Sequence, residues 1–71
     1  MTIEVLSSPD IPRKIRYAIF GSGPDDARTY DIYLIRIRTR SLLWTFINSH
    51  NDLRIARECV ASYLRIRQFM I

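Results

Sequence analysis

Residues 30–40 read Tyr-Asp-Ile-Tyr-Leu-Ile-Arg-Ile-Arg-Thr-Arg, the longest stretch of the chain that combines a period of two with the absence of Gly and Pro. Successive side chains of a β-strand point to opposite faces of the sheet, so this alternation predicts a strand with two different faces. The apolar face would carry Tyr33, Ile35 and Ile37. The cationic face would carry Arg36, Arg38 and Arg40. We expect the rest of the fold to cover the apolar face and the arginines to meet water or anions.

Two earlier segments are predicted to pair with this strand. Residues 13–20 alternate, with Ile15, Tyr17 and Ile19 on one side. A connection of about nine residues, rich in Gly, Pro and Asp, joins them to the central strand, which indicates an antiparallel hairpin. Residues 2–6 alternate weakly and are predicted as an edge strand. Residues 7–12 contain two prolines and are predicted as a loop.

The segment 42–48 fits two templates. As a strand it places Leu42, Trp44 and Phe46 on one face. As a helix it groups Leu42, Leu43, Phe46 and Ile47 instead. We favour the strand, because Trp, Thr, Phe and Ile are good strand formers, and we keep the helix as the alternative.

A final helix is predicted from about Asp52 to Phe69, after the cap-forming run Ser49-His50-Asn51-Asp52. At 100° per residue its apolar stripe comprises Leu53, Ala56, Val60, Tyr63 and Leu64, widened by Ile55, Cys59, Ile66 and Met70. The sequence therefore predicts one α+β domain over residues 1–71. In this small two-layer domain, an antiparallel sheet of three to four strands packs against one C-terminal amphipathic helix.

Size and composition favour self-association. A chain of 71 residues buries only about 60% of its unfolded surface, so it is marginally stable alone. Cys59 has no second cysteine for a disulfide, and with the single His50 it cannot complete a zinc site. We expect a homo-oligomer, most simply a homodimer. No run approaches the length of a membrane span, and we expect a cytoplasmic protein without a signal peptide.

Nothing in the sequence indicates catalysis. Ser49, His50 and Asp52 include the residue types of a nucleophilic triad, but they are nearly consecutive, whereas a working triad gathers distant segments around one point. Helix capping explains them better. We therefore expect no enzyme, no cofactor and no metal site.

Arginine is the residue type that most favours a binding function. The chain has 11 Lys and Arg against 7 Asp and Glu, for a net charge of +4, and ten of the cations are arginine. Alternate residues of a strand lie about 6.6 Å apart, so Arg36, Arg38 and Arg40 would form a row for carboxylates or phosphates. Arg13 and Arg16 could extend it from the neighbouring strand. Equally, the arginines could simply keep the sheet soluble.

Aromatic residues have two interpretations as well. Trp44, Phe46, Tyr30 and Tyr33 could stack on bases, but core packing or a subunit contact is the better explanation in so small a domain. We predict that Trp44, Phe46 and Tyr63 contribute to an interface. The preferred hypothesis is a small accessory or inhibitor protein that self-associates and docks on an acidic protein partner through its arginines. A nucleic-acid-binding protein using the same arginines on phosphates is the alternative.

Overall fold

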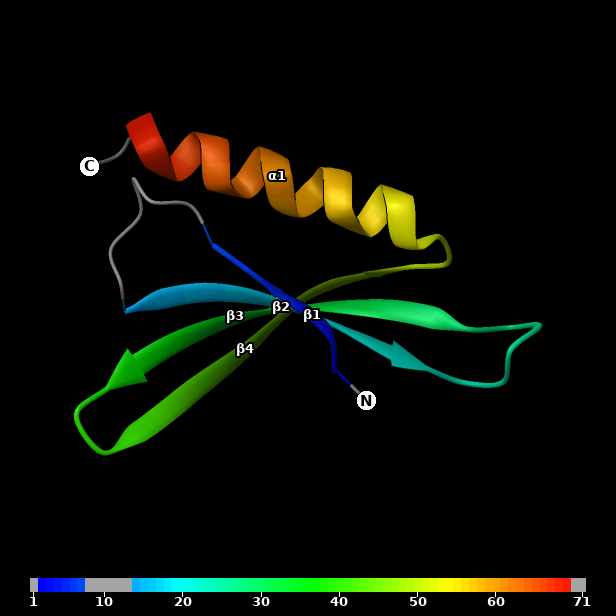
Figure 1. Ribbon diagram of the computed structural model, residues 1–71, viewed down its shortest axis with the longest axis horizontal. Helices are drawn as coiled ribbons and strands as arrows, with labels where there is room; N and C mark the ends of the chain where they lie inside the picture. The colour runs from blue at the N-terminus through cyan, green and yellow to red at the C-terminus, as the bar shows by residue number, and fades with distance from the viewer. Residues whose placement is uncertain (1, 8–13, 70–71) are drawn as a thin grey trace.

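The structure, a computed structural model, describes residues 2–7 and 14–69, and side chains as far as residue 66. Its elements are β1 (Thr2–Leu6), β2 (Ile15–Ser22), β3 (Thr29–Arg38), β4 (Ser41–His50) and α1 (Leu53–Phe69). The strands form one antiparallel sheet in the order β1-β2-β3-β4, and α1 lies along one side of it (Figure 1). The predicted α+β fold is confirmed. The predicted loop over 7–12 falls mostly outside the described residues.

The connection between β2 and β3 is shorter than predicted, because β2 continues through Gly21 to Ser22. A Cβ atom at Gly21 would lie 3.0 Å from Cδ1 of Ile3, so the missing side chain lets β1 pack against this end of the sheet. Gly23 then adopts a φ of 88°, which glycine reaches without steric cost. Gly21, inside β2, and Gly23, in the loop, therefore have different roles.

The segment 42–48 is a strand, as favoured, and β4 pairs with β3 across a two-residue turn. The register shifts between Ile32 and Tyr33, which leaves Ile47 as an extra residue in β4. Ile47 packs against the core, while Asn48 Nδ2 donates a hydrogen bond to Tyr63 Oη at 3.0 Å. The bulge thus directs two consecutive residues of β4 towards the helix.

The core lies between α1 and the sheet. Its buried cluster comprises Tyr17, Ile19, Ile32, Leu34, Ala56 and Val60. The ring of Tyr63 stacks on that of Tyr17, with centroids 5.7 Å apart. Ile55 and Ile66 stay 40% and 56% exposed, so the part of α1 that packs on the sheet is narrower than the predicted stripe.

The expectation that the helix covers the face of Tyr33, Ile35 and Ile37 is wrong. The helix covers the other face of β3, on which Ile32 and Leu34 lie on the same side as Arg36 and Arg38. Between residues 30 and 35 the sequence is largely apolar at both parities, so alternation alone does not decide which side is covered. Pairing with β2 decides it, because Ile19 and Tyr17 stand opposite Ile32 and Leu34.

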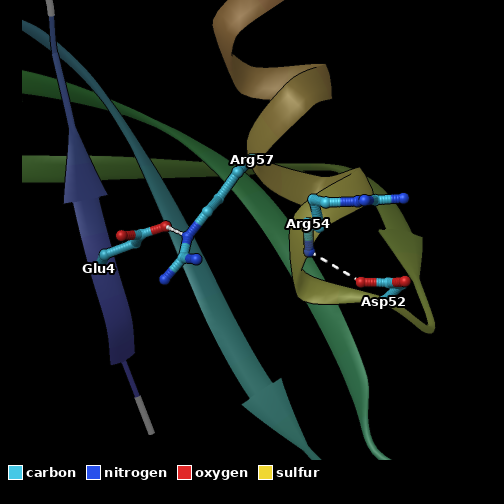
Figure 2. A network of polar contacts seen from close by, with 4 residues as sticks. All are labelled: Glu4, Asp52, Arg54 and Arg57. Carbon is cyan, nitrogen blue, oxygen red and sulfur yellow. Dashed lines mark hydrogen bonds and ion pairs between the residues drawn. The ribbon is translucent and has the colours of Figure 1, made fainter.

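Two polar contacts involve the first half of α1: one caps the helix and the other joins it to the sheet (Figure 2). Asp52 Oδ1 accepts a hydrogen bond from the backbone N–H of Arg54 at 2.9 Å, which makes Asp52 the helix cap. Arg57 Nε donates to Glu4 Oε1 at 2.5 Å and joins α1 to β1. The capping segment is shorter than predicted, because Ser49 and His50 belong to β4. Among the described residues, no helix is long and apolar enough to cross a membrane.

Candidate functional site

The sheet face turned away from α1 is the first candidate surface, and we call it the open face. Residues that stand opposite one another in the ladders share this face, so the register defines its members. They include Val5, Arg16, Ala18, Phe20, Asp31, Tyr33, Ile35, Ile37, Leu42, Trp44 and Phe46. Only two of these eleven side chains are charged.

Four aromatic rings form a connected cluster in the middle of the open face. The Tyr33 ring contacts those of Phe20, Trp44 and Phe46, with centroids 5.4, 6.0 and 5.7 Å apart. Phe20 and Trp44 also meet each other at 5.4 Å. All four contacts are edge-to-face, a geometry that contributes about 0.5–1.5 kcal/mol per pair beyond the area buried. The rings therefore hold one another in place within the chain.

Much of this apolar surface is in contact with solvent. Val5, Ile37, Leu42, Trp44 and Phe46 are each between 37% and 55% exposed. Contiguous apolar surface of this kind is uncommon on soluble monomers and usually marks an interaction site. The open face consequently resembles half of an interior.

A hollow of about 370 Å³ lies in the open face, and Asp31, one of the two charged residues of that face, lines it. Its walls include Phe20, Tyr33, Trp44 and the carboxylate of Asp31. Asp31 Oδ1 accepts a hydrogen bond from Ser49 Oγ at 2.7 Å, and Oδ2 accepts one from Ser22 Oγ at 3.4 Å. A carboxylate fixed among aromatic rings suits a cation, because the ring faces and the carboxylate both attract positive charge.

The other of the two charges is Arg16. Arg16 pairs with Ile35 across the ladder, whereas Asp31 pairs with Phe20, four residues further along β2. That spacing corresponds to about 13 Å along the strand, too far for an ion pair within one chain. Arg16 Nη1 instead donates to the carbonyl oxygen of its neighbour Ile15 at 2.8 Å. The open face thus has a positive end and a negative end.

The second candidate surface is the arginine hairpin, residues 36–43, at the turn between β3 and β4. In Figure 1 this hairpin extends to the lower left, away from α1. Arg36 and Arg38 lie on the helix side of β3, Arg40 is in the turn, and all three are exposed. Within the described part of the chain, none of the three forms an ion pair.

The five arginines that were predicted to form one binding row do not all lie on one surface. Arg16 does not extend the row of Arg36 and Arg38, because it lies on the opposite face of the sheet. Arg13 lies outside the described residues. Arg40 continues the row only as far as the tip of the turn.

The residue types of a triad are likewise separated. Ser49 Oγ donates to Asp31 on the open face, while His50 Nε2 lies 3.4 Å from Sγ of Cys59 on α1. Asp52 caps α1. Across the described residues, no group of three His, Cys, Asp or Glu side chains could hold a metal ion.

Sequence reasoning found part of the open face and missed the rest. It named Trp44 and Phe46, whereas the predicted interface residue Tyr63 lies in the core layer. It missed the participation of Phe20 and Asp31. The register of β2 on β3 is the signal that joins them, since it sets Phe20 opposite Asp31 on the face of Tyr33.

Comparison with protein-family models, curated proteins and solved structures finds no match to this chain. Function is therefore inferred from the two surfaces alone, the open face and the arginine hairpin. Their chemistries differ, one being apolar and aromatic and the other cationic.

Proposed function

We propose that this protein is a small non-enzymatic interaction module of the accessory or inhibitor type. It self-associates through the open face and docks on an acidic protein surface with the arginine hairpin. The observation that carries the proposal is the exposed aromatic cluster, in which Trp44 and Phe46 are 41% and 55% exposed on a sheet whose other face is covered. Aromatic residues and arginine are the types that protein interfaces favour.

The open face is large enough for a specific contact only if nearly all of it is used. Figure 1 looks down the shortest dimension, 16 Å, and shows α1 and the sheet one above the other in the plane of the picture, so the 28 Å dimension includes the helix layer. The open face is bounded by the 39 Å and 16 Å dimensions, an outline of about 620 Å². Two such faces would bury about 1,200 Å² in total, which is the lower end of the range for stable interfaces.

The arginine hairpin supports an acidic partner. Arg36 and Arg38 stand about 6.6 Å apart on one face of an extended strand, with Arg40 beyond them. Guanidinium groups bind carboxylates through two parallel hydrogen bonds, which favours a line of Asp or Glu side chains over isolated charges. Self-association would give each dimer two such hairpins, and an acidic surface long enough to contact both would be bound with a higher effective affinity.

A nucleic-acid partner is less well supported. Proteins that bind single strands on a sheet combine stacking aromatic rings with cations that follow the phosphates on the same surface. Here the rings of Tyr33 and Trp44 lie on the open face, and Arg36 and Arg38 lie on the other side of the sheet. A nucleic-acid strand whose bases stacked on these rings would meet only one cation on the same face among the ladder-paired residues, namely Arg16.

The test of self-association compares two exposed apolar residues of equal accessibility. Phe46 on the open face is 55% exposed and Ile66 on α1 is 56% exposed. Light scattering after size-exclusion chromatography, with nuclease treatment beforehand, should give a dimer mass for the wild type and for Ile66→Ala. Phe46→Ala should shift the mass towards the monomer. A monomeric wild type at high concentration, or equal effects of the two substitutions, would overturn the proposal.

The test of the arginine hairpin compares an Asp/Glu-rich peptide with a single-stranded oligonucleotide of equal charge. Replacing Arg36, Arg38 and Arg40 with Ala should lower peptide affinity at least about tenfold, since hydrogen bonds to charged groups contribute about 1.5–3 kcal/mol each. Arg54→Ala with Arg65→Ala, two exposed arginines of α1, is the control and should change little; compared with the double variant of Arg36 and Arg38, it removes the same charge. Tighter oligonucleotide binding with a steep salt dependence would favour the alternative.

A further inference from the structure

We propose that the second copy binds face to face in one specific orientation, with its Arg16 in the hollow that contains Asp31. This inference rests on the proposed self-association and adds the position of the symmetry axis. A two-fold axis would lie between the two sheets, parallel to both and perpendicular to the strands. It would pass level with the cross-strand row of Ala18, Tyr33 and Phe46.

The ladder register places the two charges symmetrically about that row. Along β2, Arg16 is two residues to one side of Ala18, and Phe20, which pairs with Asp31, is two residues to the other. Rotation about the axis exchanges the two ends of the face. Arg16 of the second copy is then brought over Phe20 and beside Asp31, and the reverse contact forms at the other end. One symmetry operation therefore pairs both cations with both carboxylates.

The hollow has the chemistry that a guanidinium group needs. Asp31 supplies the carboxylate, and its two oxygens are already oriented by Ser49 and Ser22. Phe20 and Trp44 line the same space of about 370 Å³ and offer ring surfaces on which a guanidinium can stack. Sheets pack about 10 Å apart, a separation that an arginine side chain reaching from one sheet can span.

The charges also distinguish this axis from the other simple choice. A two-fold axis parallel to the strands would leave Arg16 and Asp31 at opposite ends of the interface. Each Arg16 would then remain at the end of the face without a carboxylate. In the proposed orientation Phe46 of one copy meets Phe46 of the other on the axis, at the edge of the interface formed by the outer strand β4.

The decisive experiment uses two charge reversals, Arg16→Glu and Asp31→Lys, measured by sedimentation velocity and by native mass spectrometry with one variant carrying a mass tag. Each variant alone juxtaposes like charges at both ends and should dimerise at least about tenfold more weakly than the wild type. An equimolar mixture should form a heterodimer with nearly wild-type affinity. At one end, the carboxylate introduced by the first reversal meets the ammonium group introduced by the second, and at the other end the native pair of Arg16 and Asp31 is kept.

Circular dichroism of each reversal verifies that it folds. If one does not, the neutral variants Arg16→Gln and Asp31→Asn replace them. Each should weaken dimerisation, and the double variant should be no weaker than the more affected single one. Suppose that the wild type dimerises and that Phe46→Ala disrupts the dimer. This orientation is then overturned if the two charge-reversal variants do not form a heterodimer, or if the effects of the two neutral substitutions simply add. Self-association itself would still stand. A monomeric wild type would overturn both.

Discussion

The two faces of the sheet carry similar amounts of apolar side chain but have different surroundings. On the covered face, Ile19 and Ile32 have no exposed surface beneath α1. On the open face, Phe46 and Leu42 remain 55% and 54% exposed. The difference follows from the number of layers, because a single helix can cover only one side of a four-stranded sheet. Folding of the monomer therefore completes one hydrophobic interior and leaves a second incomplete.

The largest expected effect separates folding from association. Ile32→Ala removes a fully buried side chain and should lower the free energy of unfolding by about 2–5 kcal/mol at every protein concentration. Phe46→Ala should cost a constant amount of about 0.5–1.5 kcal/mol for the lost ring contact with Tyr33, and a further loss that grows with protein concentration, since a contact between copies stabilises by mass action. Urea denaturation at several concentrations measures both variants. A loss for Phe46→Ala that does not grow with concentration would show that the two faces do not differ in this way.

An intermediate loss of stability is expected from removing the hydroxyl group of Tyr63, which packs on the covered face, compared with that of Tyr33 on the open face. Tyr63 Oη accepts a hydrogen bond from Asn48 Nδ2, and Asn48 Oδ1 is buried without a partner among the described residues. Tyr63→Phe should therefore cost about 1–3 kcal/mol, because it leaves the Asn48 amide group unpaired. Tyr33→Phe keeps the ring contacts of the open face and should cost less. Thermal denaturation of both variants tests this, and equal shifts would contradict it.

The smallest effect is expected at the contact that joins α1 to the edge strand. Glu4→Gln removes the charge from the contact with Arg57, whose side chain is 53% exposed, and should cost less than about 1 kcal/mol. The loss should shrink further in high salt, because exposed ion pairs are screened. Asp25→Asn, at the 97% exposed partner of Arg28 in the β2–β3 loop, is the control and should have no measurable effect. A loss at Glu4 that persists in molar salt would indicate a packing role.

The sequence was sufficient for the fold class and for most of the elements, since these depend on local patterns, whereas for residues 42–48 it favoured a strand and left a helix as the alternative. Alternation in residues 30–38, the cap at Asp52 and the helical stripe with Ala56 and Val60 all agree with the structure. These features need only the period of the side chains and one capping group. For this reason the fold class could be predicted.

The choice of covered face could not be predicted, because it depends on how segments distant in the sequence align. Leu34 and Ile35 are equally apolar neighbours, and only the alignment of Tyr17 with Leu34 assigns them to opposite environments. The same alignment brings Asp31 and Phe20 together at a hollow that no local sequence motif predicts. Arg16 was grouped with the other arginines for the same reason, although it belongs to the open face.

The bulge at Ile47 has a consequence for how the molecule can grow. β4 is an outer strand whose outer edge pairs with no other strand among the described residues, and an outer strand can recruit the strand of another molecule by backbone pairing. Because Ile47 breaks the regular alternation of hydrogen-bonding groups, an incoming strand could continue the ladder without interruption only along residues 41–46. Lateral addition, which could repeat without limit into a fibre, is thereby restricted. Face-to-face pairing ends with two molecules, since each uses its one open face.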